Sequence, residues 1–189
     1  MLSDTSRLSD AALLRRVHAG EESAFDLLYR RHQGRIYRYA LRMSGSPEAA
    51  EDVVQEVFLA VIRGARGFDA AHGALASYLY GMARNLLFRQ GGAPPADELE
   101  EGLAVIDADP LEGLHQAEQV ERVRQALAGL PAHYREAVVL CDLEELSYAE
   151  VAEMLGVAVG TVRSRLHRAR ALLLDRLSGQ RPEKERCRA

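Results

Sequence analysis

A basic segment near the C-terminal end of the chain carries side chains that can bind a polyanion. Residues 160–181 contain six arginines and a single aspartate. Arginine presents a planar fork of N–H donors, which matches the edge of a guanine or the oxygens of a phosphate. Apolar residues recur in this segment at helical spacing. The pattern predicts a helix whose buried side is formed by Val162, Leu166, Ala169 and Leu173.

The other residues of this helix form its predicted outward face. They are Arg163, Ser164, His167, Arg168 and Ala171. Guanidinium groups, a hydroxyl and an imidazole on one face can contact base edges as well as phosphates. A plainer alternative is a solvated arginine face on a small helical hairpin. The elements that precede the helix decide between the two.

A short helix with clear start and stop signals precedes the basic one. Ser147 and Glu150 have the spacing of a capping box, and Gly156 supplies the glycine that commonly ends a helix. Helix 148–155, a short turn and helix 160–177 therefore form a predicted helix-turn-helix, which presents its second helix to the DNA major groove. Because cap, turn and arginine face agree independently, DNA binding is favoured over the hairpin alternative.

The rest of the chain is also helical in pattern, so the expected fold class is all-α. Further helices are predicted over residues 11–18, 22–43, 47–63, 74–90 and 114–127 and, after a break at 130–131, over a segment ending at 143. No stretch alternates between apolar and polar residues as a strand does. The third helix has a wide apolar stripe, expected to be buried, of Ala50, Val53, Val54, Val57, Phe58, Val61 and Ile62.

Length and charge divide the chain into two parts. With 189 residues, 48% hydrophobic and 28% charged, it has the composition of a globular protein and room for two small domains. Residues 91–118 begin with Gly-Gly-Ala-Pro-Pro and hold eight acids but no lysine or arginine. Such a segment is expected to be a flexible linker. The predicted organisation is a domain over residues 8–90, an acidic linker over 91–117 and a second domain over 118–178.

Several classes of function find no support in the sequence. Cys141 and Cys187 are isolated, and the six histidines lack metal-ligand spacing, so neither a metal site nor a cofactor is expected. Cys141 is expected to be a packing residue. No glycine-rich phosphate loop or catalytic triad order stands out, so no catalytic residue is assigned. No apolar run reaches the roughly 20 residues of a membrane span and no secretory signal is recognised, so a cytoplasmic protein is expected.

The helix-turn-helix resembles region 4 of the extracytoplasmic-function (ECF) sigma factors. The resemblance lies in Tyr-Ala-Glu-Val-Ala-Glu-Met-Leu-Gly at 148–156 and Gly-Thr-Val-Arg-Ser-Arg-Leu-His-Arg-Ala-Arg at 160–170, and residues 127–140 fit the first half of that region. It implies that the second domain reads the −35 promoter element. The implied DNA-binding residues are Thr161, Arg163, Ser164, Arg165, His167 and Arg168.

The first half resembles region 2 of the same family. Ala-Glu-Asp-Val-Val-Gln-Glu-Val-Phe at 50–58 is similar to the helix that binds core RNA polymerase, and Leu-Tyr-Gly-Met-Ala-Arg-Asn at 79–85 to the segment that reads the −10 element. The implied polymerase-binding residues are Asp52, Gln55, Glu56, Leu59 and Arg63, which share one predicted helix face. The implied −10 residues are Gly73, Leu75, Ser77, Tyr78, Arg84 and Asn85. Tyr80 is equally compatible with a contact to the DNA strand and with a place in the protein core.

The resemblance implies an all-α, two-domain sigma factor without catalytic chemistry. Its implied partners are core RNA polymerase (the β′ clamp helices and the β flap), promoter DNA and an anti-sigma factor. Departures from the family pattern include Tyr78 in place of a common tryptophan, Gln90 in place of a basic residue and Cys141 in place of a common arginine. Two alternatives stay open: a free-standing helix-turn-helix regulator, and a sigma-like interaction protein that does not initiate transcription. The acidic linker is further expected to be a solvated spacer, to shield the arginine stripe or to rest in a basic channel of the polymerase.

Overall fold

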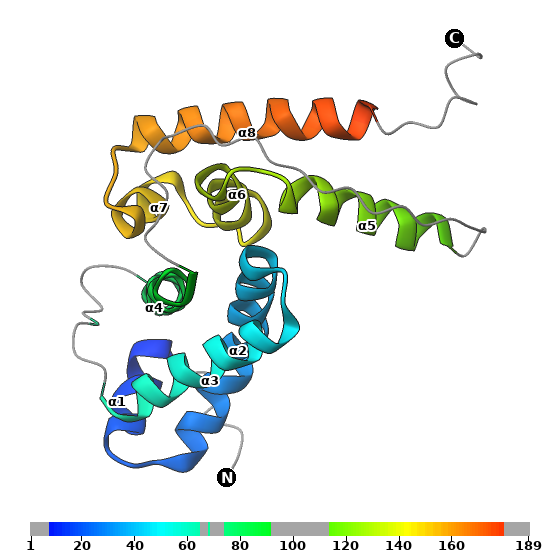
Figure 1. The fold of residues 1–189 in the computed structure, drawn as a ribbon. Coiled ribbons are helices and arrows are strands. Elements are labelled where there is room, and N and C mark those ends of the chain that lie inside the picture. Colours follow the sequence, from blue (N-terminus) through cyan, green and yellow to red (C-terminus); the bar gives the residue numbers. More distant parts are fainter. Residues whose placement is uncertain (1–7, 65–67, 69–73, 92–113, 180–189) are drawn as a thin grey trace.

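The computed structural model describes residues 8–64, 68, 74–91 and 114–179, and every regular element in that part of the chain is helical (Figure 1). Residues 92–113 of the expected acidic linker, Gly73 and the C-terminal tail beyond residue 179 lie outside the described residues, whereas Gly91 and residues 114–117 at the ends of that linker are helical. The all-α fold class is confirmed. The elements are α1 (Asp10–His18), α2 (Glu22–Ser44), α3 (Pro47–Ile62), α4 (Leu75–Gly91), α5 (Leu114–Ala128), α6 (Ala132–Val138), the π-helical turn η2 (Val139–Leu143), α7 (Tyr148–Leu155) and α8 (Val159–Gly179).

The helix ends follow the local signals in the sequence. Gly45 ends α2 in the left-handed conformation, with φ of 72°. Ser46 then caps α3, because its hydroxyl accepts a hydrogen bond from the Ala49 amide at 3.2 Å, and Pro47 occupies the first turn, where its missing N–H costs nothing. Two adjacent helices are thus separated by a turn of very few residues, which makes α2 and α3 neighbours in space.

The first half of the chain is a bundle of α1 to α4 around a shared apolar core. In Figure 1, α3 runs beside α2, and both carry apolar stripes that meet in between. Val53, Val57 and Leu28 are fully buried there. The predicted stripe of α3 is correct except for Ile62, whose side chain is 50% exposed at the last turn of the helix. The fourth helix, α4, closes the bundle with Leu75, which is buried.

A polar cluster fixes α1 on α2. The buried His32 ring places Nε2 2.7 Å from Asp10 Oδ2, and Arg31 donates to Asp10 Oδ1 at 2.8 Å and to the Leu8 carbonyl at 2.8 Å. The helical pattern alone gave no reason to bury His32. Its burial depends on Asp10, the first residue of α1, which the tertiary fold brings to it.

The second half contains the helix-turn-helix. Figure 1 shows α8 lying across α6 and α7, and the apolar side of α8 faces them. Val162, Leu166 and Ala169 are buried and Leu173 is partly buried, as predicted. The capping box is also present, since Ser147 Oγ accepts from the Glu150 amide while the Glu150 carboxylate accepts from the Ser147 amide at 2.9 Å. The orientation of α8 is therefore set by its own core residues and by a capped partner helix.

The helix predicted to run through residue 143 differs from an ordinary α-helix in its last turn. Residues 139–143 form a π-helical turn, in which the Glu144 amide donates to the Val139 carbonyl at 2.9 Å. The next residue, Glu145, has φ of 60°, a conformation that residues with a side chain seldom adopt. The widened turn brings the Glu144 side chain inward, where it is only 3% exposed. Periodicity in the sequence does not reveal such a one-residue expansion.

The two halves pack against each other. The buried residues of α1–α4 and those of α6–α8 form one continuous apolar cluster, with α4 against α7 and the C-terminal part of α2 against α6 and η2. Arg135 adds a polar link, because its guanidinium donates to the Met43 carbonyl at the end of α2 and to the Leu130 carbonyl. The exposed faces of the two halves therefore have a fixed arrangement relative to each other.

Removing the Ser147 hydroxyl should destabilise the second half. We expect Ser147→Ala to lower the free energy of unfolding by about 1 kcal/mol, the usual cost of a lost N-cap, measured by urea denaturation. Hydrogen bonds from Ser147 hold the pKa of Glu150 below its ordinary value of 4.5, so this difference is present above that pH and shrinks as the pH falls through the lowered pKa.

Ser178→Ala is the matched control. Ser178 is exposed near the end of α8, and its hydroxyl donates only to the Leu174 carbonyl of the same helix. Its loss should change the free energy of unfolding by less than about 0.5 kcal/mol. Equal effects of the two substitutions would contradict the role given to the capping box.

Candidate nucleic-acid interface

The outer face of α8 is open to solvent where the sequence predicted. Arg163, Ser164, His167, Arg168 and Ala171 are all exposed. The Ser164 hydroxyl donates to the Thr161 carbonyl at 2.9 Å, which leaves its oxygen as an acceptor facing outward. Arg168 also reaches back to Tyr134, with Nη1 3.5 Å from the phenolic oxygen. The face thus presents long cationic side chains on a helix whose opposite side is locked in the core.

Two arginines of the same helix serve the fold instead of the outer face. Arg170 makes a two-pronged ion pair with Asp142 of η2, at 2.7 and 3.0 Å, and this pairing raises the pKa of the guanidinium further. Arg165 is half-buried and lies close enough to Glu136 to lower the pKa of that carboxyl. Of the residues that the resemblance assigned to the −35 element, Arg165 and Thr161 are the least exposed.

The helix α4 presents a mixed surface. Asn85 is exposed, and Tyr78 is partly buried with its ring 5.7 Å from that of Phe68. Leu75 is 3% exposed, so its side chain belongs to the core and is not available to DNA here. Tyr80 is fully buried, so of its two expected settings the structure shows the protein core. The remaining expected residue, Gly73, lies outside the described part of the chain.

Two α4 side chains expected to contact DNA are engaged with the second half of the chain. Arg84 Nε donates to Glu136 Oε1 at 2.8 Å, and the Ser77 hydroxyl donates to Glu150 Oε1 at 3.3 Å. The sequence gave no signal for these pairs, because Glu136 and Glu150 are 52 and 73 residues away along the chain. The structure therefore joins two of the expected −10 residues to α6 and α7 of the second half.

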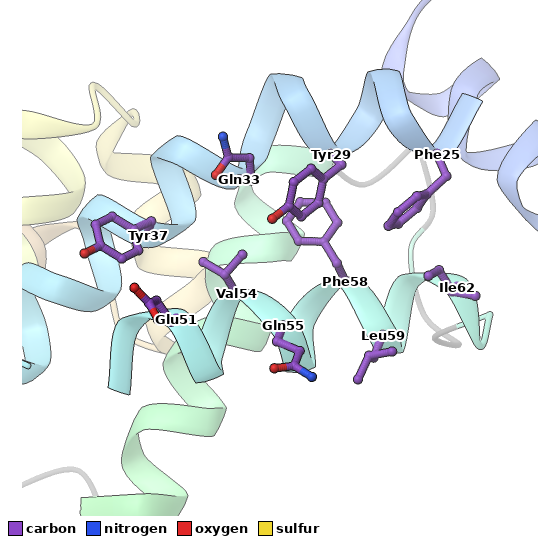
Figure 2. Close-up of a pocket in the computed structure, with 10 residues that line it drawn as sticks. All are labelled: Phe25, Tyr29, Gln33, Tyr37, Glu51, Val54, Gln55, Phe58, Leu59 and Ile62. Atoms are coloured by element: carbon purple, nitrogen blue, oxygen red, sulfur yellow. The ribbon is translucent and has the colours of Figure 1, made fainter. Parts of the chain in front are cut away.

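The polar face of α3 is exposed as the spacing predicted. Asp52, Gln55, Glu56 and Arg63 are exposed and Leu59 is partly buried among them. Beside this face, Figure 2 shows a groove between α2 and α3. Its apolar and aromatic lining comes from Phe25, Tyr29, Tyr37, Val54, Phe58, Leu59 and Ile62.

The aromatic groove was not predicted from the sequence. Tyr29 is 36% exposed and packs edge-on against Phe58, with ring centroids 4.8 Å apart, and Phe25 packs against both rings. The available signal was the pair Phe25 and Tyr29, one helical turn apart on α2. Since Ile62 is also exposed here, the groove is an apolar surface bordered by charges, a composition typical of protein-binding sites.

Metal and membrane chemistry find no counterpart in the described residues. No group of three histidine, cysteine, aspartate or glutamate side chains in that part of the chain is arranged to hold a metal ion. Among the helices described, none combines the length and hydrophobicity that a bilayer crossing requires.

Comparison with known proteins assigns the family. The family model described as Sigma-70 region 2 matches residues 28–90, and the model described as Sigma-70, region 4 matches residues 120–173. The chain is 41% identical over 170 residues to the ECF RNA polymerase sigma factor SigM of Mycobacterium tuberculosis, covering 87% of this chain and 83% of that protein. It belongs to the ECF sigma factors. It is also 38% identical to the ECF sigma factor SigE of Mycolicibacterium smegmatis, where the match covers 84% of this chain and 65% of the relative's length.

Solved structures of similar fold extend the comparison. This ECF sigma factor is similar to CnrH in complex with the cytosolic domain of CnrY, with a TM-score of 0.68 and 26% identity, covering 91% of this chain and 99% of CnrH. It is also similar to the sigma factor RpoE in complex with the anti-sigma factor NepR from Bartonella quintana, with a TM-score of 0.58 and 25% identity, covering 79% and 93% of the two chains.

Cys141 of this sigma factor should be a poor nucleophile. Burial, followed by the nearby charge of Asp142, raises the pKa of its thiol to about 11 from an ordinary value of 9.0. In a Cys187→Ser variant, we expect alkylation by iodoacetamide at pH 8 to be about a hundredfold slower in the native protein than in urea, because the thiolate is that much rarer. Similar rates in both conditions, followed by mass spectrometry, would contradict a packing role.

Proposed function

We propose that this sigma factor directs core RNA polymerase to promoters through three separate faces. The polar face of α3 with its groove binds the polymerase, the exposed part of α4 contacts the −10 element, and the outer face of α8 reads the −35 element. The observation that carries this proposal is the double-sided build of α8: apolar residues lock one side and arginines occupy the other. The proposed division is residues 8–90 for polymerase and −10 binding, and 118–178 for −35 binding.

The α3 face suits a helical, charged partner. Asp52, Gln55 and Glu56 offer carboxylate and amide groups for charge-assisted hydrogen bonds, and Arg63 adds a cation at the last turn. Leu59 and the aromatic groove beside it supply the apolar area on which binding energy concentrates. The family resemblance points to the β′ clamp helices of core polymerase as the partner of this face, and to the β flap as a contact of the second domain.

The α8 face suits the DNA major groove. Arg163 and Arg168 are placed to pair with guanine edges or phosphates, while Ser164 and His167 add polar groups between them. Thr161 and Arg165 border this face. Because each half of the chain offers few DNA contacts, tight promoter binding requires both halves to act together on the polymerase.

The α4 face suits a single DNA strand. Asn85 can accept and donate hydrogen bonds to a base edge, and Tyr78 can stack on an unpaired base. Arg84 and Ser77 join them once their present partners are released. We leave out Leu75, whose side chain is in the core, and retain Gly73 from the sequence resemblance alone.

The remaining parts of the proposal concern partners and setting. An anti-sigma factor is proposed as a regulator, since a similar sigma factor structure is a complex with one. The protein is proposed to act beside RNA polymerase in the cytoplasm, without catalytic chemistry or cofactor of its own. The decisive experiment is transcription by core polymerase, with and without the protein, from a library of randomised promoters. Transcripts sharing two upstream elements support initiation. Stable assembly without transcripts supports the interaction protein, and the absence of both assembly and transcripts supports the free-standing regulator.

Reversing one charge on α3 should weaken polymerase binding. We expect Asp52→Lys to lower the affinity for core polymerase by roughly tenfold, because a lost charge-assisted contact and a new repulsion act together. Binding is measured by fluorescence anisotropy of labelled sigma factor. Asp175→Lys makes the same charge change on the exposed surface of α8 and should leave the affinity within about twofold. Unchanged holoenzyme assembly with Asp52→Lys would refute this interface.

Removing Arg163 should cost binding at one promoter position. We expect Arg163→Ala to weaken −35 binding by about 1–3 kcal/mol and to relax the base preference at a single position. The measurement is holoenzyme binding to a panel of promoters that each differ at one base pair. Arg124→Ala is the matched control, because Arg124 is exposed on α5, pairs with Glu121 of the same helix and should leave the promoter preference unchanged. A uniform loss over the panel would instead assign Arg163 to a phosphate.

A further inference from the structure

Four arginines follow one side of α2. They recur at intervals of four, three and four residues, so their side chains leave the helix within a narrow arc of its surface. The row extends over about 17 Å of the helix axis. The acids of α2, Glu22 and Asp26, both precede the row, so no acid interrupts it. The four residues form the α2 arginine stripe: Arg31, Arg35, Arg38 and Arg42.

Carboxylates from elsewhere in the chain pair with the two ends of the stripe. Arg31 donates to Asp10 Oδ1 at 2.8 Å, and Arg42 donates to Glu144 Oε1 at 2.5 Å. Both arginines are partly buried. The fold therefore accounts for the positive charge at each end of the stripe.

The middle of the stripe is exposed and holds more positive charge than its neighbours balance. Arg35 is exposed, and none of the described carboxylates forms an ion pair with it. The side chain of Arg38 is 51% exposed, and its Nε lies 3.8 Å from Glu144 Oε1, the oxygen that already accepts from Arg42. Burial and a hydrogen-bonded carboxylate raise the pKa of the Tyr80 phenol, whereas Arg35 and Arg38 both act to lower it. The two guanidinium groups therefore lie near α4, on one side of α2.

A glycine in the interior of α2 leaves the surface beside these cations open. Gly34 directly precedes Arg35, and a Cβ atom built on it would lie 3.5 Å from Arg38 Nη1, an ordinary contact distance. Packing would therefore accept alanine, which stabilises a helix interior better than glycine does. What the glycine provides is bare backbone next to a guanidinium group, which lets a large ligand approach the helix closely.

The composition of the stripe suits phosphate groups. A guanidinium group offers two parallel N–H donors to two oxygens of one phosphate. A row of such groups fits a polymer that carries one anion per unit, as a nucleic acid does. Protein-binding surfaces instead combine an apolar centre with a charged rim, which is the composition of the groove between α2 and α3. On α2, the exposed large apolar side chain is Tyr29, which lines that groove and not the stripe.

We propose that Arg35 and Arg38 bind the phosphate backbone of promoter DNA without reading its bases. The stripe borders both halves of the chain, because Arg38 lies close to Glu144 of the second half and Arg35 lies beside α4. It therefore adds a contact between the α4 face and the α8 face, each of which the proposed function assigns to one promoter element. No rearrangement is needed, since Arg35 and Arg38 are exposed in the structure. The identity of the DNA as a promoter rests on the proposed function, whereas phosphate binding does not.

The salt dependence of DNA binding tests the stripe in the free, full-length chain. The probe is a fluorescent duplex of random sequence, titrated between about 50 and 200 mM salt. We expect Arg35→Gln to reduce the slope of log affinity against log salt concentration by about 1, because one phosphate contact and its released counterion are lost. Arg35→Gln/Arg38→Gln should reduce the slope by about 2. Arg35→Lys keeps the charge and should keep the slope.

Arg30→Gln is the matched control. Arg30 is exposed on α2 but lies five residues before Arg35, which places it on another side of the helix. Its loss removes the same charge and should leave the slope unchanged. Each variant should keep the unfolding temperature of the parent, because none of the replaced side chains is buried. An unchanged slope in Arg35→Gln, an equal fall in Arg30→Gln, or a parent chain that does not bind the duplex at the lowest salt overturns the proposal.

Directed cleavage locates the DNA and distinguishes its two sources. In a holoenzyme whose sigma chain carries Cys141→Ala, Cys187→Ser and Gly34→Cys, an iron chelate on the introduced thiol cleaves DNA within reach. Breaks in both strands between the two promoter elements identify the duplex, and breaks in one strand of the −10 element identify the separated strand; both support the stripe. An Asp26→Cys chain carries the chelate on the side of α2 away from Arg35 and should give no breaks. Missing cleavage from Gly34→Cys, or equal cleavage from both chains, overturns the proposal.

Polymerase binding separates this proposal from its alternatives. The affinity of each variant for core polymerase is measured by fluorescence anisotropy. A loss of that affinity in Arg35→Gln with an unchanged salt slope would assign the stripe to an acidic surface of a protein partner and overturn DNA binding. A parent chain that neither assembles with polymerase nor initiates transcription contradicts the proposed function, while the duplex titration of the free chain still decides whether the stripe binds phosphate.

Discussion

The contact between Tyr39 and Tyr80 is the point on which the arrangement of this molecule depends. The two rings are fully buried and meet edge-on, 5.4 Å apart, so they close the core of the first half between α2 and α4. Their hydroxyls are the donors that meet Glu136 and Glu144 from the second half. Burial raises the pKa of both phenols well above the ordinary value, so both remain protonated donors. One aromatic pair therefore completes one bundle and orients the next.

Local signals in the sequence were sufficient for the helices, apart from the π-helical turn, and for the exposed sides of α3 and α8. Helix ends at Ser46 and Ser147 follow from side chains that bind their own backbone, and the buried side of α8 follows from spacing alone. The contacts between the halves were not predictable in this way. Glu136 looks like an ordinary helical acid until Arg84 is brought to it, and Ile62 looks like a core residue until the helix ends beneath it. These outcomes depend on partners far along the chain.

The expected site residues fall into the same two groups: the exposure of some follows from local spacing, and that of others depends on partners far along the chain. Arg163, Ser164 and His167 were predicted correctly as exposed because periodicity decides which side of a helix faces out. Leu75 and Arg165 share the helices of exposed residues but are drawn inward by the packing of α4 and α6. The family motifs do not mark this difference, because a motif records residue types along the chain and not their exposure in one conformation. A functional assignment made from a motif is therefore more specific when the burial of each of its side chains in the structure is also considered.

The paired roles of the α8 arginines bear on how this protein can be re-engineered. Arg170 braces the helix against η2, and the core side fixes its depth, so neither task falls on the residues of the outer face. Arg163, Ser164 and His167 can therefore be exchanged as a set while the scaffold keeps its shape. Under the proposed function, exchanging this set would give libraries of orthogonal switches for synthetic gene circuits, in which each variant answers to its own promoter.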